Sequence, residues 1–177
     1  MITLTLFNGE TRQVPKGTTL LPLAQEFAKD FSTPIVEGVF NGETIDLQAP
    51  LDCDGTVDFI QLQGEDGMRV YVRTLLFLFL VTAKRLYPDV DIEVHNTLGS
   101  ALNCSFKSEK KLSAKEMKLV EAEMRKLVEE KAPIQLLRIT KAEALEKYGH
   151  LCNEDLAPML CNIADDDLVT VYSLGDR

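Results

Sequence analysis

The first 64 residues alternate apolar and polar positions in short runs, which is the periodicity of β-strands. Asn8-Gly9 and Asn41-Gly42 separate such runs, and both residue types tolerate the positive φ angles of tight hairpin turns. Between these pairs, apolar residues recur at helical spacing, with Thr19 as the expected N-cap and Pro22 in the first turn. The pattern predicts one helix over 20–31 and strands over 1–7, 11–14, 35–40, 44–47 and 56–62.

The run VYVRTLLFLFLVTAKRLYP, from Val70 to Pro88, is the most apolar part of the chain. Its apolar block, Leu75–Val81, lies between Arg73 and Lys84, and a membrane-spanning helix needs about 20 mostly apolar residues. A helix that is apolar on nearly all sides is a buried one. We therefore expect a central core helix and no membrane association.

Two capping boxes start helices further along the chain. Ser113 with Glu116, and Thr140 with Glu143, have the spacing in which each side chain bonds the other residue's backbone N–H. A polar, glycine-bearing break at 63–67 marks the expected domain boundary. The pattern predicts an α+β fold with domains 1–64 and 65–177, the second with strands over 90–94, 101–106, 134–139 and 168–172, helices ending near 131 and 149, and a helical turn over 157–161.

Charge and cysteine usage narrow the possibilities. The net charge of −9 weighs against a surface that grips nucleic acid by its phosphates, although a local basic patch is compatible with it. The acidity is concentrated before Gly64, where the cations are only Arg12, Lys16 and Lys29. Met1 leads directly into a strand pattern without a secretory signal, so we expect a cytoplasmic protein. The cysteines show no CxxC spacing and are expected to be free, buried small hydrophobes.

Residues 1–64 resemble a TGS domain, the ubiquitin-like β-grasp module at the front of threonyl-tRNA synthetases that also occurs in some GTPases and stringent-response enzymes. The resemblance is carried by Lys16-Gly17-Thr18-Thr19 before the helix, the hairpin at Asn41-Gly42, and the closing turn and strand Asp54-Gly55-Thr56-Val57. These are turns and core positions, so they imply the β-grasp fold and say little about the ligand. A nucleotide or an RNA is the ligand class that the resemblance suggests.

Residues 70–172 resemble the editing domain of threonyl-tRNA synthetases, an α+β domain shared with alanyl-tRNA synthetases as the second additional domain, which hydrolyses mischarged tRNA. The matching segments are Ala83–Pro88, Leu112-Ser113, and Val169–Tyr172 with the following Gly175-Asp176 turn. In that family the core helix carries two histidines one turn apart. The corresponding residues here are Arg73 and Phe77: arginine stays protonated and has no acceptor, and phenylalanine has no ligand atom. We therefore expect no catalytic residue in this chain.

The same two domains also begin a family of bacterial nucleoside (uridine) kinases. Their sequences look like Arg73–Phe77 in the core helix and like His95–Gly99 and Leu102–Cys104 in the strand pair. This resemblance implies a non-catalytic N-terminal regulatory or substrate-recognition region, whose partner would be a C-terminal P-loop kinase domain that uses ATP and Mg²⁺. No GxxxxGK[ST] loop occurs in the chain, and it stops soon after Gly175, so we expect a fragment truncated in its second domain.

Two other interpretations remain open at this point. The chain is alternatively a threonyl-tRNA synthetase fragment or a relative of the tRNA-editing hydrolases. A stand-alone module that senses a nucleotide or an RNA is the third possibility, and the sequence contains nothing that sets an oligomeric state.

Arg73, His95 and Asn96 are the candidate pocket residues, because they would line what remains of the editing groove and bind a nucleoside or phosphate. A buried cation needs a partner, so the structural alternative is a salt bridge from Arg73 to Asp91 or Glu93. The remaining candidate metal ligands match no zinc spacing, so we expect no metal site; they are His150, Cys152 and Cys161. We expect Asp165–Asp167 to form a solvated turn.

Overall fold

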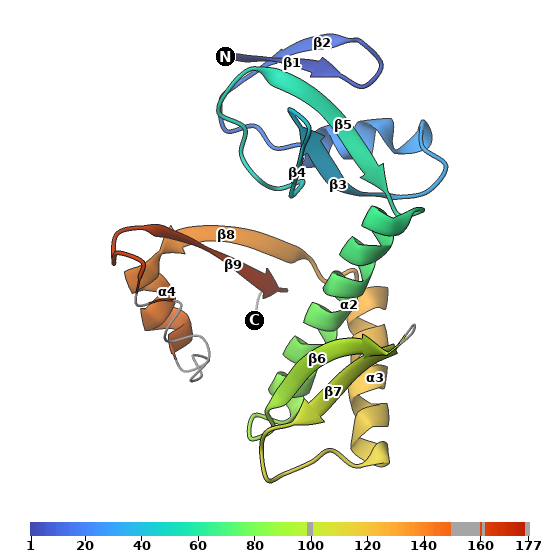
Figure 1. Ribbon diagram of the computed structural model, residues 1–177, viewed down its shortest axis with the longest axis vertical. Helices are drawn as coiled ribbons and strands as arrows, with labels where there is room; N and C mark the ends of the chain where they lie inside the picture. Colours follow the sequence, from blue (N-terminus) through green and yellow to red (C-terminus); the bar gives the residue numbers. More distant parts are fainter. Residues whose placement is uncertain (99–100, 150–159, 161, 176–177) are drawn as a thin grey trace. The chain divides into compact units, whose positions relative to one another are not determined.

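The computed structural model describes residues 1–98, 101–149, 160 and 162–175 and shows an α+β fold (Figure 1). The chain divides into two units, 1–131 and 132–177, and each is described by itself. The boundary predicted after Gly64 falls inside the first unit, between its five-stranded sheet and its long helix, and stays a prediction.

The first unit begins with a mixed sheet in the order β2-β1-β5-β3-β4. The first and last strands are parallel neighbours; the first forms an antiparallel hairpin with β2, and the last lies beside the antiparallel hairpin of β3 and β4. Both hairpins turn at the predicted Asn-Gly pairs, where Gly9, Asn41 and Gly42 have positive φ. The strands are β1 (Ile2–Leu6), β2 (Thr11–Val14), β3 (Ile35–Phe40), β4 (Glu43–Ile45) and β5 (Gly55–Gln61).

Helix α1 (Leu21–Glu26) and the 3₁₀ turn η1 (Phe27–Lys29) pack their apolar residues into the core of this sheet. Pro22 lies in the first turn as predicted, but Thr19 is not the N-cap. The cap is Leu20, which makes no side-chain bond; instead, the backbone N–H of Leu21 donates to Leu47 O at 2.8 Å. A tertiary contact thus replaces the predicted side-chain cap. The buried core consists of Ile2, Leu4, Leu6, Leu20, Leu23, Ala24, Phe27, Leu51, Val57 and Phe59.

Helix α2 (Glu65–Leu86) begins five residues earlier than the apolar run predicts. Gly64, with φ 114°, is its N-cap, and Glu65 and Asp66 fill the first turn, where the helix dipole favours negative charge. Gly67 is buried, and a Cβ there would meet the carbonyl oxygens of Gln61 and Leu62. The glycine-bearing break is therefore the close-packed start of the helix.

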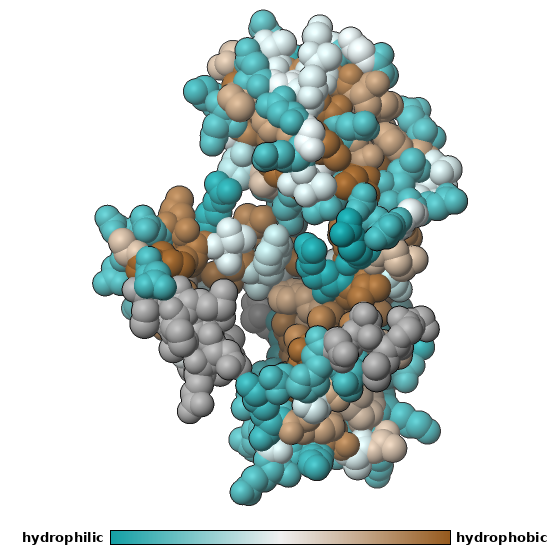
Figure 2. Space-filling view, in the orientation of Figure 1, coloured by the Kyte–Doolittle hydropathy of each residue, from teal (hydrophilic) through white to brown (hydrophobic). Residues whose placement is uncertain are grey.

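The prediction that the apolar helix is buried on nearly all sides is wrong. Leu78, Thr82 and Ala83 are buried, while Tyr71 is 48% and Leu75 is 43% exposed. The second half of α2 packs with helix α3 (Ala114–Glu129) and the hairpin of β6 (Ile92–Leu98) and β7 (Ala101–Phe106). Figure 2 shows apolar side chains at the surface beside the middle of α2. Among the described residues, no helix is long and apolar enough to cross a membrane.

The second unit pairs β8 (Ile134–Thr140) antiparallel with β9 (Leu168–Leu174), beside helix α4 (Lys141–Tyr148). Lys141 Nζ donates to Ile163 O at 2.7 Å and lies 3.0 Å from Asp165 Oδ1. The acidic turn is thus tied to α4 and is exposed, as predicted. Both capping boxes, at Ser113 and Thr140, are confirmed. Most of the helical turn predicted over 157–161 lies outside the described residues.

Candidate functional site

Arg73 lines a hollow in the first unit, about 170 Å³ in volume. One wall is the sheet, through Glu37 on β3 and Thr44 on β4. The other wall is the beginning of α2. The residues contributed by α2 are Asp66, Arg69, Val70 and Arg73.

The local fold explains why these side chains converge. Gly38 faces α1, since a Cβ there would meet Leu20 Cδ1, and neighbouring strand residues point to opposite faces. Glu37 therefore faces away from α1, and the β-bulge between Ile35 and Glu37 locally changes the direction of the strand. Thr44 pairs with Val39, which puts it on the same face as Glu37. The four α2 residues follow an i, i+3, i+4, i+7 spacing and share one side of the helix.

The charges in the hollow are only partly paired. Arg69 donates to Asp66 in the first turns of α2. Among the described residues, neither Arg73 nor Glu37 has a side-chain hydrogen bond or an ion pair. Burial raises the pKa of Glu37, and the positive charge of Arg73 partly opposes that rise. Glu37 and Arg73 thus interact through space without a direct bond.

The predicted salt bridge from Arg73 to Asp91 or Glu93 is wrong. Asp91 pairs with Lys84 at 2.7 Å, and Glu93 lies 3.6 Å from Lys107 Nζ. Both carboxylates therefore pair with lysines close to the β6–β7 hairpin. Arg73 does not pair with them, because it lies two turns into α2.

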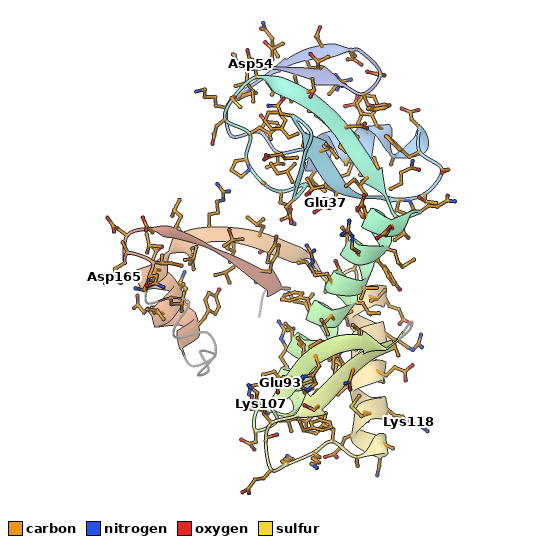
Figure 3. All side chains as sticks on the ribbon, in the orientation of Figure 1. Glu37, Asp54, Glu93, Lys107, Lys118 and Asp165 are labelled. Atoms are coloured by element: carbon orange, nitrogen blue, oxygen red, sulfur yellow. The ribbon has the colours of Figure 1, made fainter. Side chains whose placement is uncertain are left out.

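The second candidate, His95, lies on the β6–β7 hairpin with different neighbours. Its Nε2 is 2.6 Å from Ser105 Oγ and 4.0 Å from Glu93 Oε2. Figure 3 shows Glu93 and Lys107 close together on this hairpin. The side chain of Asn96 lies outside the described residues, so a pocket shared by Arg73, His95 and Asn96 stays a prediction.

Other reactive groups in the described part of the chain form no recognisable centre. Phe77, one turn after Arg73, is half-buried. No cluster of three or more histidine, cysteine or carboxylate side chains there could hold a metal ion. Cys53 and Cys104 are exposed thiols, so the expected burial is wrong for these two, because one lies in a turn and the other on a half-covered hairpin. The other metal candidates, His150, Cys152 and Cys161, lie outside the described residues.

The beginning of α3 carries a group of exposed lysines that we call the α3 lysine group: Lys111, Lys115 and Lys118. Within the described residues these three lysines have no ion-pair partner. Further along α3, by contrast, Arg125 pairs with Glu121 at 2.7 Å. Figure 3 shows Lys118 on α3, away from Glu93 and Lys107. The lysine group is thus a local basic surface on an acidic protein.

Comparison with known proteins gives a consistent answer. No protein-family model matches the chain. The threonine–tRNA ligase of Streptococcus uberis is 31% identical over 183 residues, that of Desulforamulus reducens 25% over 176, and threonine–tRNA ligase 1 of Bacillus subtilis 24% over 176. Each match covers 99% of this chain but only 27% or 28% of the relative. The homologues are therefore threonyl-tRNA synthetases, and the chain matches an N-terminal region of them.

These relatives overturn the kinase interpretation. The predictions of a nucleoside (uridine) kinase region and of a P-loop kinase domain as its partner are wrong. The inference of a kinase region from Arg73 and Phe77 fails for a simple reason. These two residues show that the editing histidines are missing from the helix, but they do not show to which family the chain is related. The expectation of ATP and Mg²⁺ concerns residues outside this chain and stays a prediction, as does the cytoplasmic location.

The sequence singled out Arg73 but missed the residues that share its hollow. Asp66 and Arg69 precede Arg73 by seven and four residues, which is helical spacing, but they were missed because the predicted helix began only at Val70. Glu37 and Thr44 carry no such signal, because only the tertiary fold brings them next to α2.

Proposed function

We propose that this chain is the counterpart of the TGS and editing-like domains of a threonyl-tRNA synthetase, and that it binds tRNA without hydrolysing the aminoacyl ester. The observation that carries the proposal is the similarity over 99% of the chain to threonine–tRNA ligases. Its partner is then a synthetase catalytic domain. The relatives are more than three times as long as this chain, so they have room for such a domain.

The fold supports the assignment of the two domains. In residues 1–64 two hairpins, β1–β2 and β3–β4, lie on either side of β5, which runs parallel to β1, and the sheet packs against α1; this is the arrangement expected of a β-grasp module. From residue 65 onward, a long helix is followed by a strand pair, a capped helix and a further strand pair. This order matches the one predicted for an editing-like domain.

The absence of hydrolysis follows from the side chains of α2. In the synthetase editing domains that the chain resembles, two histidines occupy the places of Arg73 and Phe77. At those places in the family a histidine nitrogen can accept a proton near neutral pH, as a general base must. The guanidinium of Arg73 cannot accept one, and the ring of Phe77 has no acceptor.

The α3 lysine group is the proposed contact with the phosphates of tRNA. Lys115 and Lys118 lie three residues apart on one helix face, and Leu112, which is buried, anchors the loop that carries Lys111. Because carboxylates do not neutralise these lysines, they are available to replace counterions along an RNA backbone. The sheet is a poorer candidate, since Arg12 there is held by Glu10 and Glu26.

Filter binding of threonine-specific tRNA over a range of salt concentrations tests the proposal. Replacing Lys111, Lys115 and Lys118 together by Gln should weaken binding and reduce the slope of log K against log salt by about 2 to 3. The matched control, Arg125→Gln with Lys126→Gln on the same helix, removes cations that already pair with glutamates and should leave the slope nearly unchanged. Equal effects of the two variants, or no binding by the wild type, would refute the proposal.

A further inference from the structure

We propose that the hollow between the sheet and the beginning of α2 binds a free α-amino acid, with the ligand's carboxylate at Arg73 and its ammonium group at Glu37. The site lies on the face of the sheet away from α1. The proposal is independent of tRNA binding, because a free amino acid has no phosphate and makes no use of the α3 lysine group.

The charges around the hollow favour a zwitterion over a simple anion or cation. Arg69 and Asp66 neutralise each other through their direct contact. The remaining charges on its walls are one carboxylate, on Glu37, and one guanidinium, on Arg73, while Asp46 adds a negative charge close to Glu37. Inorganic phosphate would be attracted by Arg73 and repelled by Glu37, whereas a ligand with both charges is attracted at both ends.

Glu37 and Arg73 lie on opposite walls of the hollow. A molecule that carries an ammonium group next to a carboxylate can accept from Arg73 and donate to Glu37 at the same time. Hydrogen bonds in which both groups are charged are roughly twice as strong as neutral ones. The ligand would thus give a direct partner to the half-buried Glu37 and to the exposed Arg73, neither of which has one from the described part of the protein.

The surroundings of Glu37 support this role. Its side chain is half-buried, and burial raises its pKa. A carboxylate withdrawn from water is stabilised by a charged hydrogen-bonding partner. The β-bulge next to Glu37 also fits a binding role, since such bulges are frequent beside functional sites, where they re-aim a side chain.

The walls of the hollow suit a small amino acid. Its volume of about 170 Å³ has room for a small ligand in place of water. Thr44 supplies a hydroxyl group and Val70 supplies methyl groups. A side chain with one hydroxyl and one methyl group, such as that of threonine, suits both.

NMR titration of the ¹⁵N-labelled chain with L-threonine tests the proposal. We expect saturable shifts of the amides of Glu37, Thr44 and residues 66–73. N-acetyl-L-threonine lacks the ammonium charge and L-threonine methyl ester lacks the carboxylate, and each should bind at least about tenfold more weakly. Absence of saturable shifts, equal binding of the blocked compounds, or tighter binding of inorganic phosphate at the same amides would overturn the proposal.

Variants locate the two ends of the ligand. Arg73→Met and Glu37→Gln should each abolish saturation, while Arg73→Lys keeps the charge and should retain part of the affinity. Arg125→Met on α3 is the control and should titrate like the wild type. If the Met or Gln variant does not fold, as shown by the loss of a dispersed NMR spectrum, the titrations of the wild type with the two blocked compounds test the proposal instead. Failure of threonine to bind while tRNA binding persists would overturn this proposal alone.

Discussion

Gly67→Ala tests whether the close contact between β5 and the first turn of α2 fixes the hollow. In an open helix this substitution stabilises by about 0.8 to 1 kcal/mol, because alanine has the higher helix propensity. Here the new Cβ would come closer than 3.0 Å to the carbonyl oxygens of Gln61 and Leu62. These are backbone atoms, which cannot move aside as the end of a flexible side chain can.

The expected result is a net destabilisation. Overpacking typically costs about 1 to 3 kcal/mol, so after the gain in helix propensity we expect Gly67→Ala to lower the free energy of opening of α2 by up to about 2 kcal/mol. Because Asp66, Arg69 and Arg73 are carried by the same turns, the hollow should be disturbed as well.

The matched control is Gly149→Ala at the end of α4. Gly149 has a helical φ of −57°, and a Cβ there would meet nothing within 4 Å. This substitution should stabilise its helix by about 0.4 to 1 kcal/mol. Amide hydrogen exchange, followed separately for 65–86 and 141–148, measures both effects. Slower exchange in α2 of Gly67→Ala would refute the reasoning, because it would mean that the contact with Gln61 and Leu62 relaxes freely.

Two further predictions concern a helix cap and a titrating group. Ser113→Ala should lower the free energy of unfolding by about 1 kcal/mol in urea melts, since the Ser113 hydroxyl accepts from the Glu116 N–H, while Ser113→Thr should lose far less; equal losses would contradict the cap. Glu37→Gln should stabilise the protein at neutral pH, because the raised pKa of Glu37 means that its charged form is disfavoured in the fold. That advantage should fade as the pH falls through the raised pKa to below 4.5, the ordinary value, where the wild-type carboxyl is also neutral; an advantage that grows on acidification would contradict this sign.

Local sequence signals predicted most of the fold. The Asn-Gly pairs and the capping boxes involve residues close in the chain, so the hairpins and the starts of α3 and α4 follow from short-range chemistry. The early start of α2 was missed because Gly64 and Gly67 are typical of a loop. Here Gly64 caps the helix with a positive φ, and Gly67 gives room for two carbonyl oxygens.

Long-range features were beyond the reach of pattern reasoning. Hydrophobicity alone could not show which side of α2 meets α3, so Tyr71 and Leu75 were expected inside and are exposed. Likewise, Arg73 was expected to pair with Asp91 or Glu93, but Lys84 and Lys107 are closer to those carboxylates. Glu37 comes close to Arg73 only after the sheet has formed and the beginning of α2 has packed against it.

The most direct test of the account is a deacylation assay with serine attached to threonine-specific tRNA. Serine lacks only one methyl group of threonine, a difference that binding alone discriminates poorly. We predict that the chain binds this seryl-tRNA while the ester decays at the rate measured in buffer, because Arg73 and Phe77 provide no general base. Faster release of serine by the wild type, lost in Arg73→Met, would contradict the central claim.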